Sequence, residues 1–112
     1  MGAGAQLSVT DMRRAMRHPV DQPVIGEHRQ LGDVHLHIAN ISAHGFMATG
    51  PHELTRGERI VIRLPIVGRI EAHVIWMTEE RSGFQFERII RLDDFNQLID
   101  AMQPNPRLRK AR

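Results

Sequence analysis

The sequence predicts an all-β fold of six short antiparallel strands, followed by one C-terminal α-helix. Apolar and polar residues alternate with a period of two through much of residues 20–86, which is typical of half-buried strands. Glycine, proline and short polar groups interrupt this alternation and mark the turns. From residue 95 onward, the apolar spacing changes to that of a helix. The pattern indicates a small antiparallel barrel or sandwich with a helix docked on it.

The first three strands follow a short arginine-rich arm. The first is expected near residues 22–27, where Pro23 suits an edge strand or a strand start. The second is expected at residues 33–38, where apolar residues alternate with one aspartate and two histidines. A tight polar turn at residues 40–45 then joins it to a third strand that begins at Phe46.

The last three strands are predicted from the same alternation. In residues 60–64 and 70–77 the expected inward positions are all apolar, and the positions between them are mixed, with a turn bracketed by proline and glycine between the two strands. The inward positions are Ile60, Ile62 and Leu64, then Ile70, Ala72, Val74 and Trp76. Residues 78–83 are expected to form a polar hairpin loop, and residues 84–86 carry the sixth strand. Because Trp76 and the two phenylalanines of the last strand alternate at period two, we expect all three in the core.

One amphipathic helix ends the folded part of the chain. Asp93 and Asp94 are expected to cap its N-terminus, and Pro104 and Pro106 prevent it from continuing. Its apolar residues fall at i, i+3, i+4 and i+7, so they form one stripe that docks on the barrel. The stripe consists of Phe95, Leu98, Ile99 and Met102.

The chain of 112 residues is long enough for one domain with a single core. We expect residues 1–10 to be disordered, residues 11–103 to form the domain, and residues 104–112 to be a flexible basic tail. The absence of cysteine excludes disulfides and thiolate metal sites. No apolar run approaches the roughly 20 residues of a membrane-spanning helix, and no secretory signal is present. A soluble cytoplasmic protein without membrane insertion is therefore expected.

Arginine supplies all but one of the 15 basic residues, yet the formal net charge is only +2. Four basic residues lie in the last six positions, so the folded body is nearly neutral. A bulk nucleic-acid-binding protein needs a continuous basic face. We therefore expect no nucleic acid partner.

A basic arm precedes the first strand and carries Arg13, Arg14 and Arg17. Asp11 is a candidate cap for a short helical turn, which Pro19 prevents from extending. A guanidinium is planar and always charged, and its donors match phosphate oxygens or the O6/N7 edge of guanine. An arm of this kind could clamp a guanine nucleotide. Taken alone in an arginine-rich chain, however, the simpler interpretation is that these arginines are solvated residues of the terminus.

The polar turn at residues 40–45 supplies a second set of polar groups. The side chains of Asn40 and Ser42 are short and hydrogen-bond to nearby backbone or to a ligand, and Gly45 permits a positive φ. Alone, such a turn is common, so its significance comes from the arginine arm before it.

In this order the arm and the turn resemble the signature of the PilZ domain family, which are bacterial receptors for the second messenger cyclic di-GMP. The family pattern is Arg-x-x-x-Arg, followed further along by Asp/Asn-x-Ser-x-x-Gly. This chain reads Arg13-Arg14-Ala15-Met16-Arg17 and then Asn40-Ile41-Ser42-Ala43-His44-Gly45. The likeness covers roughly residues 12–90 and continues through Gly57-Glu58-Arg59-Ile60-Val61-Ile62-Arg63-Leu64-Pro65, Val74-Ile75-Trp76 and Gly83-Phe84-Gln85-Phe86.

The resemblance implies a six-stranded antiparallel β-barrel with a C-terminal α-helix. It also implies that arginines of the arm grip the phosphates and guanine edges of the ligand, while the asparagine and the serine hydrogen-bond to it from the barrel surface. The glycine would keep the turn close to the ligand. Asn40 stands where aspartate is also common, so it offers an amide in place of a carboxylate. The expected residues that bind cyclic di-GMP are Arg13, Arg14, Arg17, Asn40, Ser42 and Gly45.

By this likeness the protein is a signalling adaptor. Its arm is mobile because its arginines repel one another and lack partners, and the dianionic ligand orders the arm against the turn. An unidentified downstream protein then reads the changed surface. One alternative is a PilZ-like protein-interaction module that binds no nucleotide. Another is a single-stranded nucleic-acid-binding barrel that uses its basic ends.

Catalysis and metal binding have no supporting pattern. Ser42 and His44 are close in sequence, but no nucleophile elbow surrounds the serine. The seven histidines lack the spacing of a metal site, and we interpret them as surface residues that alternate with core positions. We expect no cofactor and no enzymatic activity.

Overall fold

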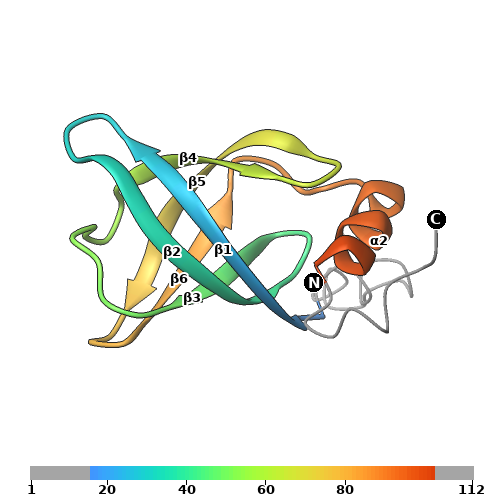
Figure 1. Ribbon diagram of the computed structural model, residues 1–112, viewed down its shortest axis with the longest axis horizontal. Coiled ribbons are helices and arrows are strands. Elements are labelled where there is room, and N and C mark those ends of the chain that lie inside the picture. The colour runs from blue at the N-terminus through green and yellow to red at the C-terminus, as the bar shows by residue number, and fades with distance from the viewer. Residues whose placement is uncertain (1–15, 103–112) are drawn as a thin grey trace, which may run out of the picture.

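The protein is a closed six-stranded antiparallel barrel with one helix at its end (Figure 1). The computed structural model describes residues 16–102. Around the barrel the strand order is β1-β2-β3-β6-β5-β4. This confirms the barrel that the family resemblance implies, in place of a sandwich. The elements are β1 (His18–His28), β2 (Gly32–Ile41), β3 (Gly45–Thr49), β4 (Arg59–Leu64), β5 (Gly68–Met77), β6 (Arg81–Phe86) and α2 (Leu92–Ala101).

The barrel interior is filled by the inward half of each alternating strand. Phe46 of β3 stacks on Phe84 of β6 with ring centroids 4.6 Å apart, and the ring of Phe86 lies 5.6 Å from that of Phe46. All three side chains are buried. Offset-stacked aromatic pairs stabilise beyond the area that they bury. The expected core positions of the two phenylalanines of the last strand are therefore confirmed.

Three strands differ clearly in extent from the sequence prediction, and one of them is β2, which runs to Ile41 instead of ending near Ile38. β1 begins at His18 and includes Pro19, whereas we expected a strand near residues 22–27. Pro19 pairs with Asn40, and a register shift between Pro19 and Gln22 leaves Val20 and Asp21 without ladder partners. β6 begins at Arg81, so the predicted loop at residues 78–83 is shorter than expected.

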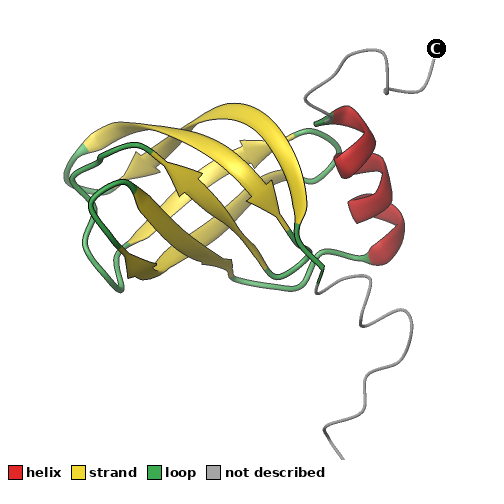
Figure 2. Ribbon diagram, turned by 90° about the horizontal axis from the view of Figure 1, so that it is seen from below, coloured by secondary structure: helices red, strands yellow, loops and turns green. Residues whose placement is uncertain are grey.

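Helix α2 closes one end of the barrel (Figure 2). Phe95, Leu98 and Met102 are fully buried, and Ile99 packs against the same core, as the periodicity predicts. The ring of Phe95 meets His18 of β1 edge-on, with centroids 5.6 Å apart. The helix therefore packs next to the point where β1 begins.

The predicted cap of this helix is wrong. Arg91 is the N-cap residue and makes no side-chain cap hydrogen bond. Asp93 and Asp94 lie inside the first turn, where a carboxylate interacts favourably with the positive end of the helix dipole.

Several predictions fall on residues that the structure does not describe. These are the disorder of residues 1–10, the helical turn begun by Asp11, and the basic tail at residues 104–112. Within residues 16–102, no helix is long and apolar enough to cross a membrane.

We predict that Phe95→Ala destabilises the fold by about 3–5 kcal/mol, because the change leaves a cavity between α2 and the barrel. Asn96→Ala is the matched control, since Asn96 is exposed on the same helix and its loss should change stability by less than about 0.5 kcal/mol. Urea unfolding measures both. Equal midpoints for the two variants would contradict the docking of α2.

Candidate functional site

The predicted polar turn is the connection between β2 and β3. β2 extends to Ile41 and β3 begins at Gly45, so only three residues form the turn. The backbone N–H of Ser42 donates to the Gly45 carbonyl at 2.8 Å, and the Ser42 hydroxyl accepts the N–H of His44 at 3.2 Å. Ser42 is only 3% exposed. Its hydroxyl therefore shapes the turn from beneath the surface.

Gly45 does not adopt the positive φ that its place in the turn suggested. Among residues 16–102 the glycines with positive φ are Gly32, Gly50, Gly57 and Gly68, so Gly45 does not use that freedom. A Cβ built on Gly45 would overlap the carbonyl oxygen of Phe84 and lie 3.0 Å from the Gln85 Cα. The glycine is required because β3 and β6 approach so closely there.

Backbone hydrogen bonds hold this turn against the rest of the barrel. The His44 carbonyl accepts the N–H of Phe86 at 2.8 Å, and the Ala43 carbonyl accepts the N–H of Ile90 at 2.9 Å. The second bond comes from the segment that leads into α2. The turn is thus fixed to both β6 and the helix linker.

The structure brings the arm and the turn together. The Arg17 Nη1 donates to the Asn40 Oδ1 at 3.0 Å, across 23 residues of sequence. The Asn40 Nδ2 in turn points to the Met47 Sδ at 3.6 Å. Arg17 therefore has a partner, contrary to the expectation that the arm's arginines lack one. Arg13 and Arg14 lie outside the described residues.

Asn40 begins a row of residues that crosses four strands on the outer face of the barrel. The ladder pairs Asn40 of β2 with Met47 of β3, Met47 with Gly83 of β6, and Gly83 with Trp76 of β5. We call these four residues the outer row. Three strand spacings make it about 14 Å long.

Trp76 lies on the outer row, so its predicted place in the core is wrong. A register shift between Val74 and Trp76 moves the indole to the outer face, where it is 38% exposed. A Cβ at Gly83 would overlap the indole Nε1 and Cε2, so the ring lies directly over the Gly83 backbone. An isolated glycine within a strand is the one sequence signal for such a close approach.

Two further histidine clusters lie outside the motif residues. The His52 Nδ1 accepts the N–H of Leu54 at 3.2 Å, which leaves its Nε2–H to donate to the Ser82 hydroxyl at 2.8 Å. A histidine that donates to a serine does not activate it as a nucleophile. The His28 Nδ1 likewise accepts two backbone N–H groups, while its Nε2 meets Glu58 at 3.1 Å. Over residues 16–102, no three potential metal ligands converge.

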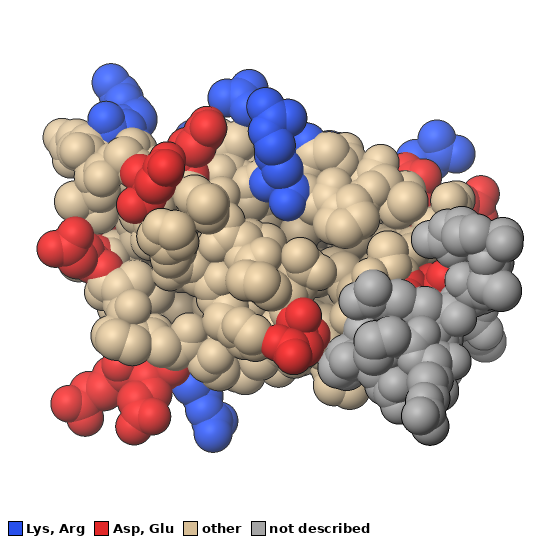
Figure 3. All heavy atoms as spheres, in the orientation of Figure 1, with Lys and Arg blue, Asp and Glu red and all other residues tan. Residues whose placement is uncertain are grey.

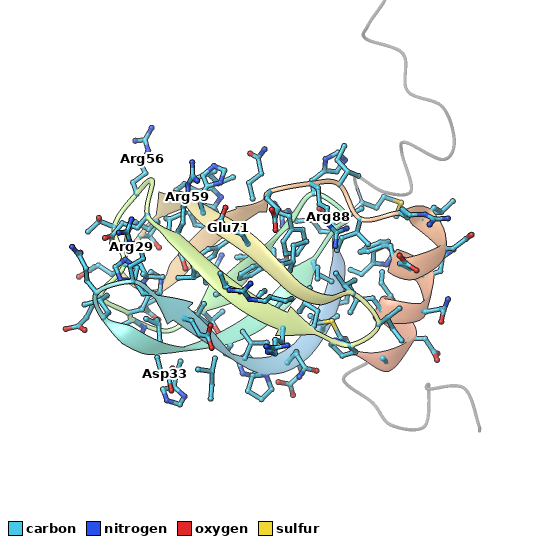
Figure 4. The ribbon with its side chains drawn as sticks, turned by 90° about the horizontal axis from the view of Figure 1, so that it is seen from above. Arg29, Asp33, Arg56, Arg59, Glu71 and Arg88 are labelled. Atoms are coloured by element: carbon cyan, nitrogen blue, oxygen red, sulfur yellow. The ribbon has the colours of Figure 1, made fainter. Side chains whose placement is uncertain are left out.

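The other faces of the barrel offer weaker candidates. A groove of about 680 Å³ between β1, β2 and β4 includes none of the motif residues. Arg59 and Glu71 form an exposed pair at 3.7 Å on the upper face (Figure 4). On the face seen in Figure 3, basic side chains are separated by acidic and uncharged ones, without a continuous basic strip.

The closed barrel and the terminal helix define a small β-barrel domain. The chain belongs to the PilZ domain family, whose model matches residues 11–103. This family is known for receptors of cyclic di-GMP. A similar solved structure is that of the PilZ domain of CeSA from a cellulose synthesizing bacterium. It is 19% identical with a TM-score of 0.55, and the match covers 79% of this chain and 95% of that one, which supports the fold alone. No curated protein matches the chain.

We predict that Gly83→Ala displaces the indole of Trp76 from the strand, because the new methyl group occupies the position of the ring. Trp76 is the single tryptophan and no tyrosine is present, so intrinsic fluorescence reports on this ring. Its emission should move to longer wavelength as the ring enters water. Gln85→Ala, an exposed change on the same strand, is the control. An unchanged Gly83→Ala spectrum in a folded protein would contradict the stacking.

The pKa of His52 is lowered below its usual 6.5 because burial disfavours the charged form. Below about pH 6.5 the unfolded chain therefore binds a proton that the folded protein does not, and stability falls as the pH falls. We predict that wild type loses more stability between pH 7 and pH 5.5 than His52→Gln, as measured by urea unfolding at each pH. Parallel losses in the two proteins would show that His52 is not the cause.

Proposed function

We propose that this protein binds cyclic di-GMP on the surface formed by Arg17, Asn40 and the outer row. The observation that carries the proposal is the hydrogen bond of 3.0 Å between Arg17 and Asn40. It joins the two halves of the family motif, which lie 23 residues apart in sequence. The two motif halves thus meet at one end of a row that is long enough for both bases of a dinucleotide.

The chemistry of this end suits an anionic guanine nucleotide. The guanidinium of Arg17 is exposed and pairs with a neutral amide, and no carboxylate of residues 16–102 neutralises its charge. A phosphate or the O6/N7 edge of guanine offers it a bidentate partner. The Asn40 amide both donates and accepts, so it can hydrogen-bond to the ligand beside the arginine.

Arg13 and Arg14 complete the positive side of the site in this proposal. Their segment precedes Arg17, whose contact with Asn40 already fixes the base of the arm. Ordering by the ligand therefore concerns the residues before Arg17, where an anion would relieve the repulsion between guanidinium groups. Ser42 and Gly45 contribute by holding the turn, and through it the backbone next to Asn40.

The outer row adds an aromatic surface to this polar end. Trp76 presents a partly exposed ring, and Met47 lies between it and Asn40. Base–aromatic stacking contributes about 1–3 kcal/mol per base. We infer that one guanine stacks here while the phosphates face the arm, and that a downstream protein reads the ordered arm together with the occupied surface.

We predict that calorimetry with cyclic di-GMP shows binding to the wild type, accompanied by a change in Trp76 fluorescence. Arg17→Ala should weaken affinity at least tenfold to a hundredfold, because a charged hydrogen bond contributes about 1.5–3 kcal/mol. Arg56→Ala is the matched control, since it removes the same charge from a loop at the edge of the molecule (Figure 4).

Cyclic di-AMP and GTP serve as ligand controls in the same titrations. A folded wild type that gives neither heat nor a fluorescence change with cyclic di-GMP would refute the proposal and favour the protein-interaction module. Equal affinities for wild type and Arg17→Ala would instead refute the role of the arm.

A further inference from the structure

The end of the outer row farthest from Arg17 has a partly exposed ring above bare backbone. The Trp76 indole covers Gly83, and its exposure of 38% leaves part of the ring open to solvent. An exposed tryptophan does not receive the full stabilisation that burial of its side chain would give. A planar ring can stack on the open part of the indole.

A second arginine lies two residues along β6 from Gly83, the residue that the indole covers. Arg81 shares the outward face of β6 with Gly83, because the intervening Ser82 and the following Phe84 point into the core. Two residues along a strand are about 7 Å apart, which is within reach of an arginine side chain. Arg81 is exposed and its Cα partner on β3 is Thr49, which is uncharged.

The guanidinium of Arg81 has no carboxylate partner within residues 16–102, whereas Arg59 on the upper face is paired with Glu71 (Figure 4). The backbone of Arg81 is held by Thr78, whose hydroxyl accepts the Arg81 N–H at 3.2 Å. The backbone of Arg81 is therefore held in place while its guanidinium is free to bind a ligand. A ligand with an anionic group, or with two adjacent hydrogen-bond acceptors, would suit it.

We propose that Trp76, Gly83 and Arg81 form a guanine-recognition subsite, in which the base stacks on the indole and Arg81 reads its O6/N7 edge. This inference rests on the proposed binding of cyclic di-GMP and assigns the specificity for guanine to Arg81. Guanine presents two acceptors on that edge, which match the arginine fork. Adenine presents an acceptor and an amino donor there, so the fork meets one unfavourable donor.

Arg17 and Arg81 then serve opposite ends of the ligand. Arg17 holds the end at Asn40, and Arg81 selects the base at Trp76. With Arg17 on a phosphate, its loss should weaken both cyclic dinucleotides by a similar factor, whereas loss of Arg81 should change the discrimination between bases.

The test compares the affinities of cyclic di-GMP and cyclic di-AMP for wild type, Arg81→Ala, Arg17→Ala and Arg56→Ala, by calorimetry. For Arg81→Ala we expect about a tenfold to hundredfold loss of affinity for cyclic di-GMP, little change for cyclic di-AMP, and a ratio of the two near unity. Arg81→Lys should keep the charge but lose most of the discrimination, because lysine cannot form the fork.

Each result separates the subsite from the proposed function. If wild type and Arg81→Ala show the same ratio of affinities while Arg17→Ala binds weakly, the subsite is wrong and the proposed function stands. If Arg81→Ala weakens both ligands equally, Arg81 supplies charge and not base specificity, which also overturns the inference. No binding of cyclic di-GMP to wild type would refute both proposals.

Discussion

The close approach of β3 to β6 at Gly45 is the constraint on which the rest of the site depends. The Gly45 backbone lies so near the Phe84 carbonyl that no Cβ fits between them. The same approach sets the ladder in which Phe46 pairs with Phe84 and Met47 with Gly83. The inward pair stacks to form the core, while the outward pair lies on the outer row. One backbone contact therefore fixes the inner and outer faces together.

Bulges then decide which side chains reach the outer row. A register shift between Ile38 and Asn40 places the Asn40 amide opposite Met47, and another after Val74 places Trp76 opposite Gly83. Without either shift, the strict period of two would turn these side chains to the other face. The two ends of the row thus depend on local departures from regular strands, next to the strands whose packing fixes the core.

The architecture could be predicted from the sequence because it depends on local patterns, whereas the motif residues were named from the family resemblance. Alternation places the strands, and the i, i+3, i+4, i+7 stripe places Phe95 against the barrel. A bulge adds one residue to a strand without any mark in the apolar pattern, so alternation alone does not reveal it. The unbroken period of two therefore predicts Trp76 in the core. The role of Gly45 was likewise out of reach, because its close neighbour is 39 residues away in sequence and contacts it only through β3–β6 pairing.

The pairing of Gly83 with Trp76 argues that the outer row is more than a by-product of folding. A glycine within a strand costs roughly 0.5–1 kcal/mol relative to alanine, and an exposed indole recovers only part of the stabilisation that a buried one gives. The glycine and the exposed indole occur at the same ladder position. Neither cost is offset by packing of the indole in the core. What they produce together is a flat aromatic surface in line with Asn40 and Arg17. Natural sequences depart from local rules mostly where function requires it, so this position supports a ligand surface that extends beyond the family motif.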